Sequence, residues 1–337
     1  MKAAQLQAPN EFAIVDLPSR PLGRGEVRVR VASTGICGSD MGIIRGLNPF
    51  ARYPVVPGHE FSGTLAEVGE GSRFKVGQRV YVKPMPTCGQ CKACLAGEFN
   101  HCPDLKVLGV HMDGSYAEEV VVAEDLVRPL PDGMSFDEGA MIEPAAIGVH
   151  TVNRSLLKPG ETVAVLGAGV IGLMVAQVAK ARGAGAVFAS DVLDSRLELA
   201  RELGVDAVAN AEKQDVVKAG LESVGPFDAV VDLAGPRHTL DQAIALARAG
   251  GRIVLLVPPE DPKLVVDDFT SVFRKELTLR VSRLYDKDFD DAAPLIAAGK
   301  IRVMPLVTHR FPLDRVREAV DVVANRRENA VKVMLHC

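Results

Sequence analysis

The sequence predicts an α/β protein with two domains, one made mostly of short β strands and one built on a doubly wound parallel sheet. The chain has 337 residues, a length that suits two domains. Short runs broken by proline and glycine fill the first 150 residues, and Glu26 to Val31 alternates strictly, as a half-buried strand does. From about residue 151, apolar strands alternate with helical segments, which is typical of a parallel sheet covered by helices.

A glycine-rich turn organises the second region. It lies between an apolar strand and a helix and reads Leu166-Gly167-Ala168-Gly169-Val170-Ile171-Gly172. Gly167 permits the turn, Gly169 lets the backbone approach a pyrophosphate, and Gly172 lets helix and strand pack closely. The helix that opens at Val170 and Ile171 would direct free N–H groups at the phosphates.

An acid at the end of the next strand strengthens this interpretation. Ala186 to Ser190 reads as a strand and ends in Asp191, which lies 19 residues beyond Gly172. Dinucleotide sites place an acid about 20 residues beyond the turn, where it bonds the ribose hydroxyls and repels a 2′-phosphate. The pattern therefore favours NAD over NADP. The alternative to a dinucleotide site is an ordinary βα turn followed by an aspartate that caps a helix.

Four of the six cysteines crowd into residues 88–102 with the spacing C-x2-C-x2-C-x7-C, at Cys88, Cys91, Cys94 and Cys102. In a cytosolic chain such crowding indicates a metal rather than disulfides. Four thiolates on one short loop form the closed tetrahedral site of a structural zinc. An iron–sulfur cluster, whose usual spacings fit less well, and inert thiols are the alternatives.

A second set of candidate ligands is scattered along the chain. Cys37 and the pair His59-Glu60 stand beside glycines, in turns where side chains can converge. Glu143 lies inside the apolar run Ala140 to Val149, and a buried acid needs a partner such as a metal. From these residues alone, a catalytic metal and ordinary structural roles both stay open.

Composition excludes several classes of partner. The net charge is −4, so no basic field indicates nucleic acid, and this disfavours a zinc ribbon at the four-cysteine loop. No apolar stretch reaches the roughly 18 residues that a membrane span needs. The first residues do not start a signal peptide, so we expect a cytoplasmic protein.

Taken together, these motifs resemble one family along essentially the whole chain. The zinc-dependent medium-chain dehydrogenases carry, in the same order, Cys37-Gly38-Ser39-Asp40, Gly58-His59-Glu60, the four-cysteine lobe, Ile142-Glu143-Pro144 and the Gly167 turn. The acid after Ile142 favours the polyol, threonine and sugar-acid branch. Three further stretches are similar to bacterial hexonate dehydrogenases, which oxidise L-galactonate or L-gulonate: Val107 to Tyr116, Thr308 to Pro312 and Asn325 to Glu328.

The resemblance implies a particular division of the chain. Residues 1–150 and 285–337 would form a GroES-like catalytic domain, with a structural zinc lobe at residues 86–104. Residues 151–284 would form an inserted Rossmann domain that binds NAD. The family also implies a homo-oligomer, either a dimer or a homotetramer, and two zinc ions per chain.

It also implies roles for single residues. Cys37 and His59 would ligate the catalytic zinc, with Glu60 or Glu143 as the remaining protein ligand. Ser39 matches the hydroxyl that passes the alcohol proton outward.

Two positions leave questions open. Many relatives continue this relay with a histidine, whereas this chain has Met41-Gly42-Ile43-Ile44, which leaves the proton's exit open. Arg196 matches a position that flanks the adenine and could also assist a phosphate.

The implied reaction is NAD-linked oxidation of a secondary alcohol on a polyol or sugar acid. A threonine dehydrogenase and an NADPH-dependent carbonyl reductase are alternatives within the same class. A non-catalytic, nucleotide-binding regulator is a rival from another class. The complete set of Cys37, His59 and Glu143 disfavours that rival.

Overall fold

Two compact units make up the chain in the computed structural model, which describes residues 1–235, 237–256 and 265–337. The first unit contains residues 1–143 and 303–337, and the second contains residues 144–302. Residues 144–150 and 285–302, which the sequence placed in the catalytic domain, therefore lie in the second unit. In this division, the C-terminal part of the first unit begins at residue 303.

Hydrogen bonds explain this later boundary. Asp288, in the short helix η3 (Lys287–Asp291), accepts a bond from Nδ2 of Asn153 at 2.9 Å and lies 3.1 Å from Nδ1 of His150. The backbone N–H of Arg302 donates to the side chain of Gln177 at 2.8 Å. These bonds attach the segment to helices of the second unit, a long-range pairing that alternating patterns in the sequence do not reveal.

The first unit is built on a seven-stranded sheet with the order β14-β15-β3-β4-β5-β7, and β6 also pairs with β3. In β3 the alternation predicted from the sequence buries Val27, Val29 and Val31 in an apolar core. A separate hairpin joins β1 and β2. The strands are β1 (Lys2–Ala8), β2 (Glu11–Asp16), β3 (Glu26–Gly35), β4 (Glu60–Val68), β5 (Arg79–Val82), β6 (Glu119–Ala123), β7 (Val127–Pro129), β14 (Val307–Pro312) and β15 (Lys332–His336).

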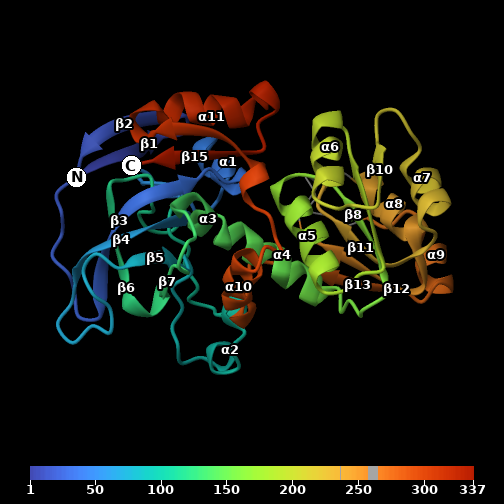
Figure 1. The fold of residues 1–337 in the computed structure, drawn as a ribbon, viewed down its shortest axis with the longest axis horizontal. Coiled ribbons are helices and arrows are strands. Elements are labelled where there is room, and N and C mark those ends of the chain that lie inside the picture. The colour runs from blue at the N-terminus through green and yellow to red at the C-terminus, as the bar shows by residue number, and fades with distance from the viewer. Residues whose placement is uncertain (236, 257–264) are drawn as a thin grey trace. The chain divides into compact units, whose positions relative to one another are not determined.

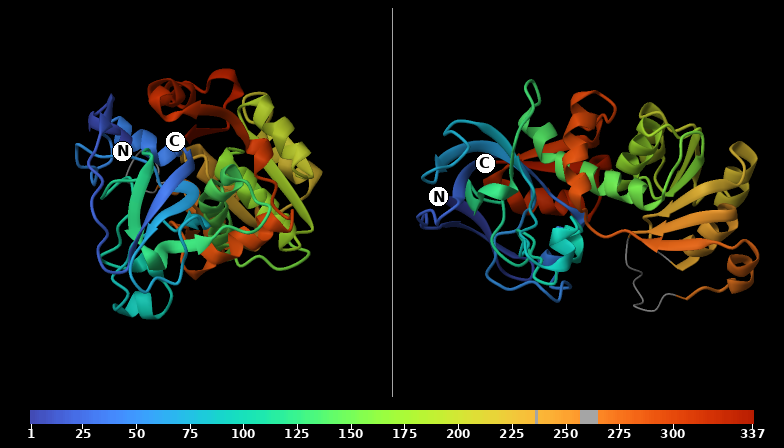
Figure 2. Two further views of the ribbon diagram at one scale, coloured as in Figure 1. Left: turned by 60° about the vertical axis from the view of Figure 1, so that its left-hand side comes forward. Right: turned by 90° about the horizontal axis from the view of Figure 1, so that it is seen from below.

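The last strand returns to the middle of this sheet. β15 pairs in antiparallel register with β3, where Met334 lies opposite Gly35, and in parallel with β14. Figures 1 and 2 show this C-terminal strand, in red, beside the blue N-terminal strands. The helices of the unit are short: α1 (Gly38–Ile44), α2 (Lys92–Leu95), α3 (Phe136–Ala140), α11 (Val316–Ala324) and the 3-10 turns at Phe99–His101, Glu124–Leu126, Met304–Leu306, Leu313–Arg315 and Arg327–Asn329.

The second unit is the parallel sheet that the sequence predicts. Its six strands follow the order β10-β9-β8-β11-β12-β13, and all neighbours run parallel. Helices α5 and α6 lie beside one face, and α7, α8 and α9 beside the other (Figure 1). The strands are β8 (Thr162–Leu166), β9 (Ala186–Asp191), β10 (Ala207–Asn210), β11 (Phe227–Asp232), β12 (Ala247–Leu255) and β13 (Thr278–Val281).

The connecting helices pack their apolar faces on this sheet. Leu240 and Ile244 of α8 join Phe188, Phe227 and other strand residues in one buried cluster. The helices are α4 (Ile142–Arg154), α5 (Val170–Ala181), α6 (Asp194–Glu202), α7 (Val216–Ser223), α8 (Arg237–Leu246), α9 (Phe269–Arg274) and α10 (Ala292–Ala297). The sequence pattern predicts a helix over residues 239–248 and a strand over residues 251–257. In the structure α8 ends at Leu246 and β12 covers Ala247–Leu255, and Val257 lies outside the described residues.

Across the described parts of the chain, no helix combines the length and the apolar character required to cross a membrane.

Candidate metal and nucleotide sites

A cysteine, a histidine and a glutamate converge in the first unit. Cys37 precedes α1, and His59 directly precedes β4. Strands β3 and β4 are antiparallel, with Gly35 opposite Glu60, so the segments beyond these strand ends come together. The ligand atoms of Cys37, His59 and Glu60 all lie within 4.8 Å of one another.

Ser39 lies at the same place. Its hydroxyl donates to Sγ of Cys37 at 3.2 Å and lies 3.5 Å from Nε2 of His59. The thiol and the Nε2 edge of the imidazole therefore face a common space beside this hydroxyl. Ser39 is exposed, whereas His59 and Glu60 are buried.

A buried carboxylate orients the histidine. Asp40 accepts bonds from the backbone N–H of Cys37 at 2.9 Å and from the hydroxyl of Tyr116 at 2.8 Å, both through Oδ2. Its Oδ1 lies 3.3 Å from Nδ1 of His59. Burial acts to lower the pKa of His59, but the Asp40 carboxylate outweighs burial and holds that pKa well above its usual value. An N–H directed from Nδ1 to Asp40 leaves Nε2 to bind a metal.

Sequence reasoning missed this support. In the sequence, Asp40 stands out only as part of a family motif, and Tyr116 is not marked as its partner. One signal was available: Asp40 stands three residues after the residue that precedes the helix, the spacing at which an acid bonds back to the helix start. No local signal marks Tyr116, which is 76 residues from Asp40 in the chain.

The third member of the group, Glu60, is paired with a lysine. Oε2 of Glu60 lies 2.5 Å from Nζ of Lys332, and the side chains are only 1% and 3% exposed. Nζ also donates to the carbonyl oxygen of Ile36 at 3.2 Å. Burial acts to lower the pKa of Lys332, but the negative charges of Glu60 and Cys37 outweigh burial and raise that pKa.

The other acidic candidate, Glu143, stands apart from the three-residue group. It is buried in the first turn of α4, and its charge also favours the charged form of Lys332. The group of ligand atoms within 4.8 Å contains Glu60 and not Glu143. Lys332 was missed by sequence reasoning, although a lysine at an inward position of the final apolar strand was the available signal.

This donor set suits zinc. Thiolate sulfur, imidazole nitrogen and carboxylate oxygen are the usual protein ligands of the ion. Catalytic zinc sites use three protein ligands and leave one position for water or substrate. Cys37, His59 and Glu60 could therefore hold a catalytic zinc with the Ser39 hydroxyl beside it.

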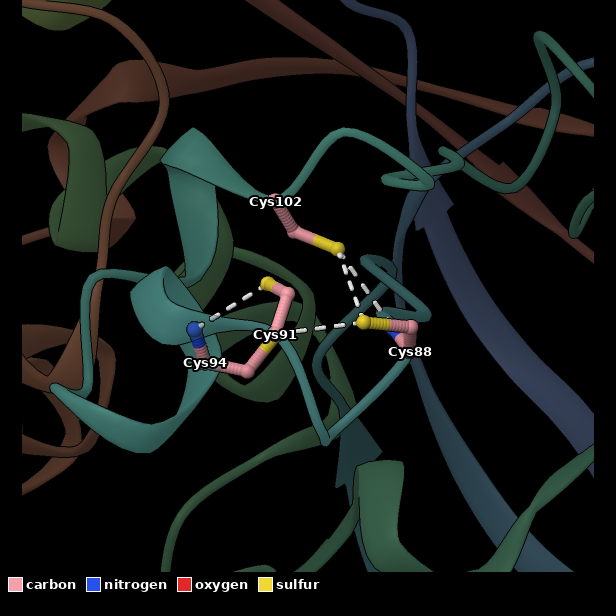
Figure 3. A group of neighbouring side chains, drawn as sticks. All are labelled: Cys88, Cys91, Cys94 and Cys102. Atoms are coloured by element: carbon pink, nitrogen blue, oxygen red, sulfur yellow. Dashed lines mark hydrogen bonds between the residues drawn. The ribbon is translucent and has the colours of Figure 1, made fainter.

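The four cysteines of the lobe also converge (Figure 3). Sγ of Cys88 lies 3.9 Å from Sγ of Cys94 and 3.6 Å from Sγ of Cys102, and the backbone N–H of Cys94 donates to Sγ of Cys91 at 3.4 Å. A tetrahedral zinc with Zn–S bonds of about 2.3 Å places its sulfurs about 3.8 Å apart. Hydrogen bonds from backbone N–H groups lower the pKa of Cys88 to about 7, which favours a thiolate ligand. The spacing and the donors fit a closed zinc site.

The glycine turn of the second unit has the positive φ and the close packing that its glycines predict. Gly167 has a φ of +100° and donates its N–H to the carbonyl of Ser190 at 2.8 Å. A Cβ on Gly172 would lie 1.9 Å from the carbonyl oxygen of Gly167, so only glycine fits. Helix α5 begins after Gly169, and the N–H groups of Val170 and Ile171 belong to the first turn, which has no helical acceptors.

Two charged side chains flank this turn. Asp191 ends β9, and its carboxylate accepts bonds from the N–H groups of Ala168 at 2.8 Å and Leu193 at 3.0 Å. A Cβ on Gly169 would lie 3.8 Å from Nη1 of Arg196, which places that guanidinium beside the turn. β8 lies between β9 and β11, so the turn stands where the strand order reverses and α/β proteins bind nucleotides.

Comparisons with known proteins identify the family. Residues 23–132 match the alcohol dehydrogenase GroES-like domain, and residues 170–298 match the zinc-binding dehydrogenase family. Sorbitol dehydrogenase of Bacillus subtilis is 32% identical over 100% of this chain and 97% of its own length. The 2-dehydro-3-deoxy-L-galactonate 5-dehydrogenase of Pseudoalteromonas atlantica is 36% identical over 100% of this chain and 99% of its own length.

Solved structures share the whole fold. An alcohol dehydrogenase of Escherichia coli CFT073, complexed with NADH, has a TM-score of 0.94 at 34% identity and covers 100% of this chain and 99% of its own. A zinc-binding dehydrogenase of Sinorhizobium meliloti, bound to NADP, has a TM-score of 0.93 at 34% identity, with the same coverage.

The fold and these matches define a zinc-dependent alcohol oxidoreductase. The chain belongs to the medium-chain dehydrogenase/reductase superfamily, in its polyol and sugar-acid branch. The fold class predicted from the sequence, a GroES-like domain with a Rossmann domain, is confirmed.

Proposed function

We propose that this protein is an NAD-dependent dehydrogenase that oxidises a secondary alcohol of a polyol or sugar acid, with a hexonate such as L-galactonate or L-gulonate as the candidate substrate. The observation that carries the proposal is the convergence of Cys37, His59 and Glu60 with the Ser39 hydroxyl against two of them. A regulator that only bound nucleotide would not require this donor set.

Two zinc ions per chain follow from this proposal. Cys37 and His59 would hold the catalytic ion, and Glu60 or Glu143 would supply the acidic ligand. The four sulfurs of the lobe would hold the structural ion, which staples a loop with few apolar residues. The spacing of the sulfurs supports this second assignment.

The chain's own groups would then position the substrate and move its proton. When bound, the zinc supplies a Lewis acid that lowers the pKa of the substrate hydroxyl, and NAD supplies the hydride acceptor. Oγ of Ser39 takes up the hydroxyl proton and passes it outward, while the C–H hydrogen leaves as hydride to give the ketone. Because Ser39 is exposed, we propose that this proton goes directly to solvent, without the histidine that relatives place nearby.

Asp191 supports NAD rather than NADP. Its carboxylate is fixed by two backbone N–H groups beside the glycine turn, so it cannot easily turn away from a 2′-phosphate. Arg196 lies close enough to the turn to oppose this repulsion in part. We expect kcat/KM with NAD to exceed that with NADP by about fivefold or more, since a single like-charge contact at about 4 Å costs roughly 1 kcal/mol or more.

The test is NADH formation with a panel of L-galactonate, L-gulonate, sorbitol, galactitol, L-threonine and simple alcohols, with zinc measured per chain. Turnover of a polyol or sugar acid with two zinc ions supports the proposal. Preference for L-threonine, or for carbonyl reduction with NADPH, would move the protein to another branch of the class. A chain that stays inactive after zinc is added back would be the nucleotide-binding regulator.

Two further expectations belong to the same proposal. All six cysteines are free thiols, which suits the reducing cytoplasm where we place the protein. We also propose a homo-oligomer, a dimer or tetramer, which light scattering on the purified chain would measure directly.

A further inference from the structure

An imidazole and a phenyl ring meet at the surface of the first unit, outside the group of candidate metal ligands. The ring centroids of His111 and Phe50 lie 5.8 Å apart, and the ring planes are inclined by 34°. Both side chains are exposed. Leu47, in the turn that carries Phe50, and Met112, beside His111, are exposed as well. Several large apolar side chains left open to water on two adjoining turns indicate a binding surface.

The turn that carries His111 is fixed to the segment that leads into the metal group. The backbone N–H of Ser115 donates to the carbonyl of Gly58 at 3.0 Å. The two segments pack so closely that a Cβ on Gly109 would lie 2.5 Å from the backbone nitrogen of Gly58. Because two residues of chain span at most about 7 Å, the Cα of His111 lies within about 11 Å of that nitrogen. Gly58 directly precedes His59, the candidate zinc ligand.

Phe50 belongs to the other segment that builds the metal group. It follows α1 in the chain, and that helix begins directly after Cys37 and contains Ser39. The backbone N–H of Phe50 donates to Oδ1 of Asn48 at 2.9 Å, which stabilises the turn. The two rings are therefore carried by extensions of the segments that supply the thiol, the hydroxyl and the imidazole of the candidate catalytic site.

Hydrogen bonding decides which nitrogen of His111 is offered to a ligand. The backbone N–H of Val107 donates to Nδ1 of His111 at 3.0 Å. A neutral imidazole that accepts through Nδ1 has its proton on Nε2, so Nε2–H is a donor. Among the described residues, this nitrogen has no hydrogen-bond partner. A free N–H donor binds an anionic oxygen more strongly than a neutral one.

We propose that His111 and Phe50 form a substrate subsite for a hydroxylated carbon chain that ends in a carboxylate. Nε2–H of His111 donates to the carboxylate, and the ring of Phe50 packs against C–H groups of the chain. The inference rests on the proposed function, because it names the groups that bind the part of the substrate remote from the reacting carbon. His111 thereby favours a sugar acid over the neutral polyol, which offers only a hydroxyl oxygen at this end.

The test is steady-state kinetics of the intact enzyme with two substrates, sorbitol and the hexonate that the wild type oxidises best. In His111→Leu the KM for the hexonate should rise about tenfold, which is what a hydrogen bond to a charged group contributes. The kcat for the hexonate and the KM for sorbitol should stay within about twofold, because only binding of the carboxylate is lost. His111→Gln keeps an N–H donor and should restore most of the preference for the hexonate.

Phe50→Ala separates the second ring from the first. The KM should rise about fourfold for the hexonate and for sorbitol alike, because contact with C–H groups does not distinguish the two substrates. Phe273→Ala removes a phenyl ring that is 75% exposed in the second unit and serves as the matched control, with no change in either KM. A rise for the hexonate alone in Phe50→Ala would contradict the role given to this ring.

A second readout does not depend on turnover. Calorimetric titration of the hexonate into the NADH-loaded protein, which cannot oxidise it, should give a Kd about tenfold higher in His111→Leu than in the wild type. If His111→Leu does not fold, His111→Glu replaces it, because a like charge should raise the KM for the hexonate and not that for sorbitol.

The outcomes separate this inference from the proposed function. Equal changes for both substrates in His111→Leu, or no change in either, overturn the inference and leave the proposed function standing. A wild type that oxidises sorbitol and no hexonate has the same meaning. A wild type that oxidises neither a polyol nor a sugar acid overturns the proposed function and this inference together.

Discussion

Oδ1 of Asp40 lies 3.3 Å from Nδ1 of His59, and both side chains are buried. The contact fixes the ring so that the opposite nitrogen, Nε2, faces Cys37 and Ser39. Tyr116 and the N–H of Cys37 bond the other oxygen of the carboxylate, which leaves Asp40 little freedom to move. A histidine held in this way is prepared to bind a metal.

Loss of this carboxylate should weaken the catalytic zinc. Asp40→Asn keeps the shape of the side chain but removes the charge that orients and polarises His59. We expect zinc affinity at the catalytic site to fall about 10- to 100-fold, with the lobe zinc retained. Chelator competition measures both sites. Asp132→Asn, at an exposed turn, is the control, and equal affinity in the two variants would contradict the assigned role.

The glycine turn allows folding to be separated from nucleotide binding. In Gly172→Ala the new Cβ would lie 1.9 Å from a backbone oxygen, so the strand and helix must separate and the protein should lose stability. In Gly169→Ala the Cβ meets its nearest neighbour at 3.8 Å, so the fold should be kept. The added methyl would still occupy the space where a pyrophosphate approaches the backbone.

Thermal unfolding and NADH titration give the two measurements. Gly172→Ala should lower the Tm by about 5 °C or more, as a loss of one to several kcal/mol does in a chain of this size. Gly169→Ala should leave the Tm within about 2 °C and weaken NADH binding at least tenfold. Tight NADH binding by Gly169→Ala would place the phosphates elsewhere.

The lobe should depend on its metal for order. Cys94→Ser removes a ligand that is buried in the cluster, so one zinc per chain should be lost and the lobe should become sensitive to protease. Cys337→Ser changes an exposed thiol outside the cluster and should alter neither property. Zinc content and limited proteolysis check this, and full zinc retention in Cys94→Ser would exclude the four-sulfur site.

Asp288 should make the stability of the second unit depend on pH in the acid range. Burial raises its pKa, but bonds with His150 and Asn153 outweigh burial and lower the pKa to about 2. Because the folded pKa is below the unfolded value of about 4, this stabilisation is complete above pH 4 and is lost as the pH falls toward 2.

Urea unfolding at several pH values tests this assignment. The free energy of unfolding of the wild type should exceed that of Asp288→Asn by on the order of 2 kcal/mol near neutral pH. This difference should shrink between about pH 4 and pH 2. Asp314→Asn, at an exposed position, serves as the control. A difference that did not change over this pH range would mean that Asp288 acts through shape alone.

Some features followed from local sequence because neighbours in the chain create them. The glycine turn needs only a strand, a turn and a helix in succession, and the four cysteines lie within one short loop. The alternation of β3 fixed its buried face. The donor pair Cys37 and His59 was also recognisable, since each stands at a strand end beside glycines.

Other features could not be predicted because they depend on distant segments. Lys332 and Glu60 are 272 residues apart and meet only through the register of three strands. The boundary near residue 143 passes through the start of one continuous helix, α4, so no turn in the sequence marks it. Residues 285–302 join the second unit through the hydrogen bonds of Asp288 and Arg302, which local alternation cannot reveal.

The sequence by itself determined the fold class, the nucleotide turn and the residue types that suit two zinc sites, because short-range spacing and side-chain chemistry decide these. Only the tertiary structure decided that Glu60 joins Cys37 and His59, that Glu143 stands apart, and that Lys332 and Asp40 restrain the group. The reason is physical: burial and pairing of charges depend on strand register, which sets distances between residues that the chain separates widely.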